Sequence, residues 1–380
     1  MKLLYACSAA LVTLASSSGA WPAAADEIKF GLLAPLTGFA AADGKSARIA
    51  AEIAVDDLNK AGGVLGEKIA LKVYDDQAQG SQAVVLAKKM IGEDHTQFAI
   101  SGSYSEPTRA AATVFQEAHI PYIAAYAVHP DVTKAGDYVF RTFQLAPPQG
   151  RAAASFLADK LKAKRISVVS INNDFGVSLL AGFKPAASKL GLEVLNEYTY
   201  SPKDRQFGSI VAGVKRDNPD ALYVTGYAFT GGPLVAQLRA AGVTVPIVAA
   251  QAFDSQTFID IAGPAAEGVY IVNALNRDNS SASFKSFMAE LKARHGDDAE
   301  STAASVYTAI TLAADAIKRA GSIDPAKVRD ALAATRDFPA MHGKLSSFDG
   351  QREIVMSMPV IVIKDGKFIY FSDISEGAFN

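Results

Sequence analysis

The clearest structural pattern in the chain lies in residues 29–63, KFGLLAPLTGFAAADGKSARIAAEIAVDDLNKAGG. This stretch opens with a short apolar run of strand length. Apolar residues then recur at helical spacing from Ala47 to Leu58, and the pair Gly62 and Gly63 ends that pattern. A strand followed by an amphipathic helix is the repeating unit of parallel α/β folds.

Apolar runs of strand length recur along most of the chain, separated by segments with helical spacing. Because parallel strands need crossover connections, this alternation predicts two successive α/β series with helices on both faces of each sheet. Pro147 and Pro148 mark the break between the two series. The predicted strands are Lys29–Leu33, Ile69–Tyr74, Phe98–Ser101, Pro121–Ala124 and Tyr138–Phe143, then Ile166–Ile171, Val194–Tyr200, Ala221–Thr225, Val245–Ala249 and Val269–Val272.

The C-terminal part of the chain follows a different pattern. A long helix is predicted up to Gly321, and Asp324 followed by Pro325 is typical of the N-cap and first turn of another helix. The pair Asp365 and Gly366, between two apolar runs, predicts a β-hairpin. We therefore expect two similar α/β lobes of about 120 residues each, a usual domain size, with the C-terminal segment divided between them.

The N-terminus has the three parts of a secretory signal peptide. Lys2 supplies a positive charge, an apolar segment runs from Leu3 to Ala15, and small residues surround a cleavage site after Ala25. The apolar segment is shorter than the ~20 residues that span a bilayer. We expect a signal peptide over residues 1–25 and release of the mature protein outside the cytoplasm.

Composition and motifs argue against several classes of function. The formal charge of −2 gives no electrostatic reason to expect binding to nucleic acid or to anionic membranes. Gly44, Lys45 and Ser46 imitate a phosphate-binding loop, but their distance from Gly38 is one residue too long. The five histidines share no metal-ligand spacing. We predict no catalytic residue, metal or cofactor, although a Ser/His/Asp set assembled only by the fold would still allow an exported hydrolase.

Several segments of the chain resemble the leucine/isoleucine/valine-binding proteins, which serve ABC importers. The resemblance begins at residues 31–38, GLLAPLTG, and continues in the same order along nearly the whole chain. The further matching segments are 56–64 (DDLNKAGGV), 74–76 (YDD), 173–176 (NDFG), 261–268 (IAGPAAEG) and 348–353, in which Phe348 and Asp349 precede Glu353.

This resemblance implies the α/β fold of a type I periplasmic binding protein, in which two Rossmann-like lobes with parallel central sheets are joined by three crossover segments. A small carboxylate ligand would bind between the lobes, and an ABC permease in the inner membrane would recognise the closed form. The implied crossovers lie near residues 143–148, 272–276 and 350–355. The implied N-terminal lobe comprises residues 26–145 and 275–350, and the C-terminal lobe comprises residues 146–274 and 351–380.

The resemblance also implies a ligand site. The ligand's carboxylate would be held in the first lobe by Ser105, Thr108 and Ala127. A helix is predicted to begin at Ser105, and the unpaired N–H groups of a helix N-terminus attract anions, although Ser105 is explained equally well as a helix cap. The side-chain pocket of the family is aromatic. The resemblance places Phe175 and Tyr227 on the second lobe, facing the cleft, and Tyr104, Tyr126, Phe229 and Phe253 in neighbouring loops. The predicted site residues among them are Tyr104, Tyr126, Phe175 and Tyr227.

Two of the positions that depart from the family pattern bear directly on the ligand's ammonium. The glutamate that pairs with the ligand's ammonium corresponds to Gln251 here, and the aromatic residue of the first loop corresponds to Asp43. A neutral amide forgoes a charge-assisted hydrogen bond worth ~1.5–3 kcal/mol. Either Asp43 or Asp254 takes over the ammonium, or the ligand is an aromatic or aliphatic acid without one.

We therefore expect a periplasmic solute-binding protein of an ABC importer that acts as a monomer and is not an enzyme. Its ligand would be a small hydrophobic or aromatic carboxylate, with specificity set by the shape of the pocket. A module that presents a ligand to a sensor and an exported α/β hydrolase are the alternative interpretations.

Overall fold

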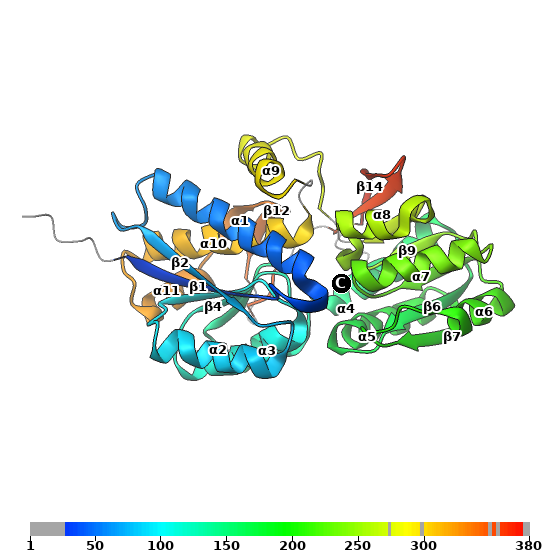
Figure 1. The fold of residues 1–380 in the computed structure, drawn as a ribbon, viewed down its shortest axis with the longest axis horizontal. Helices are drawn as coiled ribbons and strands as arrows, with labels where there is room; N and C mark the ends of the chain where they lie inside the picture. Colours follow the sequence, from blue (N-terminus) through cyan, green and yellow to red (C-terminus); the bar gives the residue numbers. More distant parts are fainter. Residues whose placement is uncertain (1–26, 273–274, 297–299, 349–351, 355–357, 375–380) are drawn as a thin grey trace, which may run out of the picture.

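The computed structural model describes residues 27–272, 275–296, 300–348, 352–354 and 358–374. The predicted signal peptide and its cleavage site lie outside these residues. The described chain forms two lobes that lie side by side along the long axis of the molecule (Figure 1). Within the described ranges, no helix combines the length and the apolar character that crossing a membrane requires.

The first lobe contains a five-stranded parallel sheet covered by helices on both faces. Its strands are β1 (Ile28–Ala34), β2 (Ile69–Asp75), β3 (Phe98–Ser101), β4 (Tyr122–Ala124) and β5 (Val139–Arg141). The helices between them are α1 (Ala41–Lys60), α2 (Gly80–Gly92) and α3 (Ser105–Glu117).

The strand order in this sheet is β2-β1-β3-β4-β5, and all neighbouring pairs are parallel. The order reverses at β1, because β2 lies on one side of it and β3 on the other. In α/β sheets, ligands bind beyond the carboxyl ends of the strands at such a switch point. The loops that follow β1 and β3 are therefore the expected place for a site in this lobe.

The second lobe contains a seven-stranded sheet with the order β14-β13-β10-β9-β8-β6-β7. Its strands are β6 (Arg165–Ile171), β7 (Glu193–Tyr200), β8 (Ala221–Val224), β9 (Ile247–Ala249), β10 (Val269–Val272), β13 (Met358–Lys364) and β14 (Lys367–Ile374). Its helices are α4 (Ala146–Ser155), α5 (Asp174–Lys189), α6 (Gly208–Asp217), α7 (Ala228–Ala240) and α8 (Gln256–Ala262).

Helices α4 and α5 pack together on one face of this sheet, and α7 and α8 pack together on the other (Figure 1). The five strands from β10 to β7 run parallel, as the alternating pattern predicts. The predicted C-terminal hairpin extends the sheet with two antiparallel strands, β13 and β14. Its turn is formed by Asp365 and Gly366, both with positive φ, which a tight two-residue hairpin requires.

After β10 the chain returns to the first lobe. There it forms α9 (Ala282–His295), α10 (Ser301–Ala320), α11 (Pro325–Ala333) and a small hairpin of β11 (Arg336–Ala340) and β12 (Gly343–Ser347). Buried residues of α9, α10 and α11 share one hydrophobic core with β1 and α1. Parts of the predicted crossovers at 272–276 and 350–355 lie outside the described residues, and the predicted lobe boundaries stay predictions.

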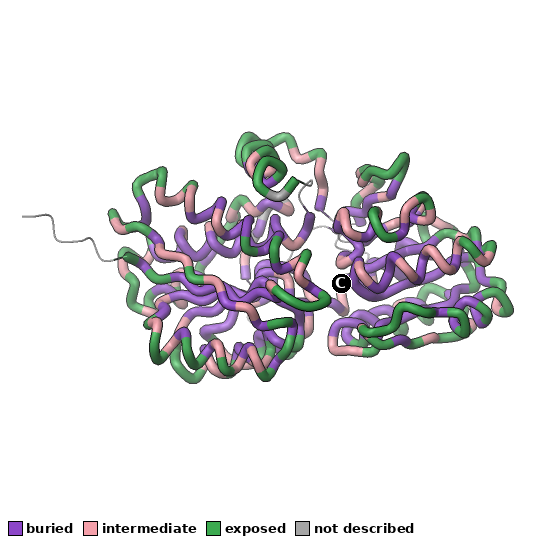
Figure 2. The backbone as a smooth tube through the Cα atoms, in the orientation of Figure 1, coloured by how far each residue is buried: buried purple, intermediate pink, exposed green. Residues whose placement is uncertain are grey.

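Apolar stripes explain how the helices pack. Ala47, Ala50 and Ala54 are fully buried on the face that α1 turns to the sheet and to α10. Small side chains there let the two helices approach closely, and the polar face of α1 stays in water. Figure 2 shows the result in both lobes, with buried strands inside and exposed helix faces outside. This packing fixes the positions of the loops that face the other lobe.

The position of α1 also excludes a phosphate-binding loop at residues 44–46. Gly44 lies inside this helix, so the residues around it form no loop that could surround a phosphate. A Cβ at Gly44 would lie 2.0 Å from the carbonyl oxygen of Pro35, which explains the glycine by close packing of helix and strand.

Candidate functional site

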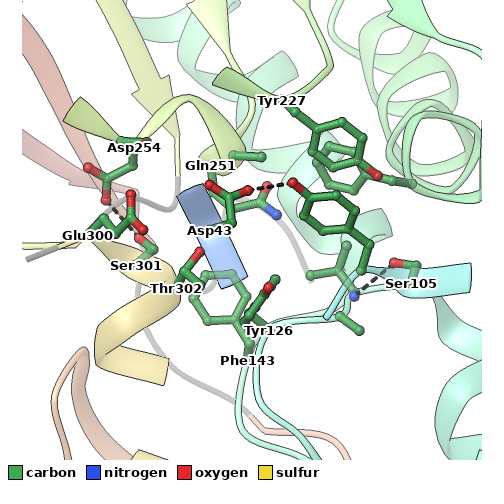
Figure 3. A pocket seen from close by; sticks show the side chains of 16 residues that line it. Asp43, Ser105, Tyr126, Phe143, Tyr227, Gln251, Asp254, Glu300, Ser301 and Thr302 are labelled. Atoms are coloured by element: carbon green, nitrogen blue, oxygen red, sulfur yellow. Dashed lines mark hydrogen bonds between the residues drawn. The ribbon is translucent and has the colours of Figure 1, made fainter. Parts of the chain in front are cut away.

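A cavity lies between the two lobes. Residues from both lobes line it, and Figure 3 shows their side chains around the cavity. The lining residues are Asp43, Tyr104, Ser105, Tyr126, Ala127, Val128, Phe143, Phe175, Tyr227, Gln251, Ala252, Asp254, Ser255, Glu300, Ser301 and Thr302.

The N-terminus of α3 forms one wall of this cavity. The N-cap residue is Tyr104 and not Ser105, so Ser105 is not the cap of the helix. The Ser105 hydroxyl instead accepts a hydrogen bond from the Val128 N–H, at 3.3 Å, and ties α3 to the loop after β4. The backbone N–H groups of Ser105, Glu106 and Ala127 have no acceptor within the described part of the chain. Together with the helix dipole, they make this wall suitable for a carboxylate.

Thr108 does not line the cavity, although it was predicted to contact the ligand. Its position one turn into α3 directs the hydroxyl toward β3, where it lies 2.5 Å from the Ser101 hydroxyl and 3.3 Å from the Ser103 carbonyl oxygen. The hydroxyl therefore stabilises the start of α3 from inside the lobe. Its position does not support the predicted contact.

A buried arginine positions the loop that carries Ala127. The Arg141 guanidinium, at the end of β5, donates to the carbonyl oxygens of Ala127 and His129 and forms an ion pair with Glu353, with Nε to Oε2 at 2.7 Å. Arg141 is fully buried. Arg141 binds the carbonyl oxygens on one side of this loop, and Ala127 and Val128 line the cavity on the other side. Sequence analysis did not single out Arg141.

Aromatic rings from both lobes form a second wall. Tyr227, the N-cap of α7, stacks on Tyr104 with the ring centroids 4.3 Å apart and on Phe175 with the centroids 5.3 Å apart. The Tyr126 hydroxyl donates to the Gly102 carbonyl oxygen at 2.8 Å, and Phe143 completes the apolar lining. All four predicted aromatic residues line the cavity.

The two further aromatic candidates do not line the cavity. Phe229 packs at its rim, against Tyr227 and Phe39, and Phe253 is buried against Phe258 in the second lobe. Of the six aromatic candidates, four therefore line the cavity.

Three carboxylic acids line the cavity, and two of them, Asp43 and Glu300, have raised pKa values. Burial raises the pKa of Asp43 to about 6, although the hydrogen bond from the Tyr104 hydroxyl, at 2.5 Å, acts in the opposite direction. Burial also raises the pKa of Glu300 to about 8; the negative charge of Asp43 adds to this, and hydrogen bonds with Ser46 and Ser255 oppose it. Asp43 was predicted as a site residue. Glu300 was not.

Gln251 and Asp254 follow β9 on the opposite side of the cavity. The Gln251 side-chain oxygen is buried and has no hydrogen-bond partner among the described residues. Asp254 is saturated, because Arg277 and the Leu275 N–H approach its two oxygens at 2.6 and 2.8 Å and the Ser301 hydroxyl donates at 2.7 Å. Both oxygens of Asp254 therefore already have partners within the protein, which argues against its predicted role as an acceptor for a ligand's ammonium.

The lobes touch each other around the cavity. Arg109 on α3 forms an ion pair with Asp174 at the start of α5, with Nη2 to Oδ2 at 2.7 Å. Phe39 of the first lobe packs on Phe229 of the second, with the centroids 5.1 Å apart. With the stack of Tyr104 on Tyr227, these contacts hold the cleft closed in this conformation. The described residues contain no group of three or more His, Cys, Asp and Glu side chains that could hold a metal ion.

Two α/β lobes that close on an interior cavity define a solute-binding protein. Residues 27–367 match the family model of the periplasmic binding proteins. The chain is 31% identical to the Leu/Ile/Val-binding protein BraC3 of Rhizobium johnstonii over 337 residues, which cover 88% of this chain and 91% of that protein. It belongs to the periplasmic binding protein family, and to its branch of leucine/isoleucine/valine-binding proteins.

Solved structures confirm the predicted type I fold. The leucine-binding protein LivK of Thermotoga maritima superposes with a TM-score of 0.87 at 27% identity, covering 92% of this chain and 99% of that one. LivJ of Streptococcus pneumoniae, solved in complex with isoleucine, superposes with a TM-score of 0.85 at 26% identity, covering 91% and 99%. These relatives are binding proteins and not enzymes.

Proposed function

We propose that this protein is exported to the periplasm, captures a small hydrophobic carboxylate between its lobes and delivers it to an ABC permease as a monomer. The observation that carries this proposal is the pairing of a helix N-terminus with an aromatic wall inside one cavity between the lobes. The helix end offers N–H groups to an anion, and the stacked rings offer an apolar surface to a hydrocarbon group. The names of the relatives favour a branched-chain amino acid within this class.

In this proposal the site residues divide the work. The N–H groups around Ser105 and Ala127 hold the carboxylate, and the Ser105 hydroxyl keeps the two segments together. Tyr104, Tyr126, Phe175 and Tyr227 surround the hydrophobic part of the ligand. Closure of the lobes then buries the ligand and creates the surface that the permease recognises. No bond is made or broken, so the solute is released unchanged.

A thermal-shift screen of the protein without residues 1–25 tests the proposal. Its ligands are leucine, isoleucine, phenylalanine, benzoate and 4-methylpentanoate, with 3-methylbutylamine as a control that lacks the carboxylate. A ligand at 100 times its Kd stabilises the folded state by about 2.7 kcal/mol, which shifts the midpoint by several degrees. At least one hydrophobic carboxylate should shift the midpoint, and 3-methylbutylamine should not.

Two outcomes would contradict the proposal. One is a screen in which no carboxylate shifts the midpoint, or in which the amine does so equally well. The other is consumption of the bound compound during prolonged incubation, which would support the hydrolase interpretation. Light scattering on the eluting peak of a gel-filtration column measures the molar mass and so tests whether the protein is a monomer.

A further inference from the structure

The cavity holds more negative groups than its surroundings balance. Asp43 reaches the cavity from α1. Glu300, the residue just before α10, reaches it from the C-terminal part of the chain. None of the described residues that line the cavity is a lysine, an arginine or a histidine. The nearby Arg277 is already paired with Asp254, with Nη2 to Oδ1 at 2.6 Å. The described residues therefore place the half-buried Asp43 and the buried Glu300 at the cavity without a cation to pair with either.

The hydrogen bonds that these acids make leave room for a ligand. The Tyr104 hydroxyl donates to Oδ2 of Asp43, and no described residue donates to Oδ1. Glu300 is only 8% exposed, and its carboxyl group is hydrogen-bonded to the hydroxyls of Ser46 and Ser255. Both acids are thus held in place by neutral donors. Neutral donors orient a carboxylate but do not compensate its charge.

A third group in the same cavity points to a ligand independently. Gln251 is 8% exposed, and its side-chain oxygen has no partner among the residues that the structure describes. Leaving a buried amide oxygen without a hydrogen bond costs about 1–3 kcal/mol, which a ligand N–H group would recover. Asp43, Gln251 and Glu300 come from three separate segments, and Figure 3 shows all three at the cavity.

We propose that Asp43, Glu300 and the side-chain oxygen of Gln251 form a subsite for a cationic nitrogen, so that the ligand is a hydrophobic amino acid and not an acid that lacks an amine. This inference rests on the proposed function and narrows its ligand class. The sequence resemblance aligns Gln251 with a glutamate that binds the ammonium. Here the charge is supplied from the other side of the cavity, and Gln251 keeps only the hydrogen bond.

Without a ligand, the subsite carries close to one negative charge near pH 7. Near pH 7 Asp43 is mostly ionised and Glu300 mostly protonated, because their pKa values are about 6 and about 8. Burial raises the pKa values of the facing Tyr104, Tyr126 and Tyr227 hydroxyls, which therefore stay neutral. His342, whose pKa is lowered to about 4 by burial, is neutral as well, and Asp254 is paired with Arg277.

An ammonium group placed beside Glu300 favours its ionised form and lowers its pKa. Binding of an amino acid near pH 7 should therefore release a proton from Glu300. Binding of the corresponding acid without an amine should release none.

Isothermal titration calorimetry tests the proposal with two ligand pairs that differ only in the amine. The pairs are leucine with 4-methylpentanoate and phenylalanine with 3-phenylpropanoate. The proteins are the wild type, Glu300→Gln, Asp43→Asn and the control Glu117→Gln, which alters an exposed residue of α3. Circular dichroism confirms that each variant is folded, and titration in two buffers of different ionisation enthalpy counts the protons released.

We expect the wild type and Glu117→Gln to bind at least one amino acid more tightly than its partner acid. Loss of one charge-assisted hydrogen bond in Glu300→Gln or Asp43→Asn should weaken amino-acid binding roughly 10- to 150-fold and leave the acid unchanged or tighter. Proton release should disappear in Glu300→Gln.

Equal affinity of the wild type for both members of each pair would overturn the inference while the proposed function stands. Folded Glu300→Gln and Asp43→Asn variants that keep full amino-acid affinity would overturn it as well. A wild type that binds none of the four compounds and none of the carboxylates in the thermal-shift screen would instead refute the proposed function itself.

Discussion

Replacing Glu300 by glutamine removes a buried carboxyl group that has no cationic partner among the described residues lining the cavity. The side chain is 8% exposed, and burial is the main reason that its pKa rises from 4.5 to about 8. In the unfolded chain the group ionises near its ordinary value. Between pH 4.5 and pH 8 the folded protein therefore holds a proton that the unfolded chain has released.

This difference makes the unliganded protein less stable as the pH rises. Each pH unit inside the window costs about 1.4 kcal/mol, so at pH 7 the group lowers the free energy of unfolding by about 3 kcal/mol. Glutamine has no proton to release, and its amide oxygen still accepts a hydrogen bond. We expect Glu300→Gln to be more stable than the wild type by up to about 3 kcal/mol at pH 7, and by close to zero at pH 4.

Urea denaturation followed by circular dichroism at pH 4, 7 and 8.5 measures this effect. The control is Glu117→Gln, since Glu117 is exposed on α3 and the substitution should leave the pH dependence unchanged. If Glu300→Gln lost stability between pH 4 and pH 7 as steeply as the wild type does, the account of a buried acid without a counter-charge would be wrong.

Three further predictions concern the aromatic wall of the cavity, the ion pair between the lobes and the buried ion pair of Arg141. Tyr227→Ala removes three ring stacks, each worth about 0.5–1.5 kcal/mol, so calorimetry should show at least roughly tenfold weaker ligand binding, whereas Tyr227→Phe should bind nearly as well as the wild type. Arg109→Ala breaks the exposed ion pair with Asp174, worth about 0–1 kcal/mol, so ligand affinity should change less than about fivefold, and 1 M salt should abolish the difference. Arg141→Met leaves Glu353 buried without its cation, so urea denaturation should show a loss of about 3–5 kcal/mol.

Much of the fold could be predicted from the sequence because its pattern is local. Each predicted strand of the two series has a counterpart in the structure, since a short apolar run beside a helical stripe fits only a few arrangements. The hairpin of β11 and β12 was not predicted. Pro339 lies inside β11, where proline usually argues against a strand, and the connecting residues Met341 and His342 carry no turn signal.

The site could be predicted only in part. Ser105 and the aromatic residues near strand ends were found because they sit beside recognisable motifs. Glu300 was missed, since its place in the cavity depends on the return of the chain to the first lobe, which brings it close to Asp43 across more than 250 residues of sequence. Arg141 was missed for a similar reason, because its partner Glu353 lies 212 residues away in the sequence.

The central claim is that a hydrophobic carboxylate binds between the lobes with its anionic end at the start of α3. The most direct test is a crystal structure of the protein with the tightest ligand from the thermal-shift screen. We expect the carboxylate oxygens within about 3 Å of the backbone nitrogens around Ser105 and Ala127, with the hydrocarbon group against Tyr227. A ligand bound outside the cavity, or inside it with its carboxylate turned away from α3, would contradict the account.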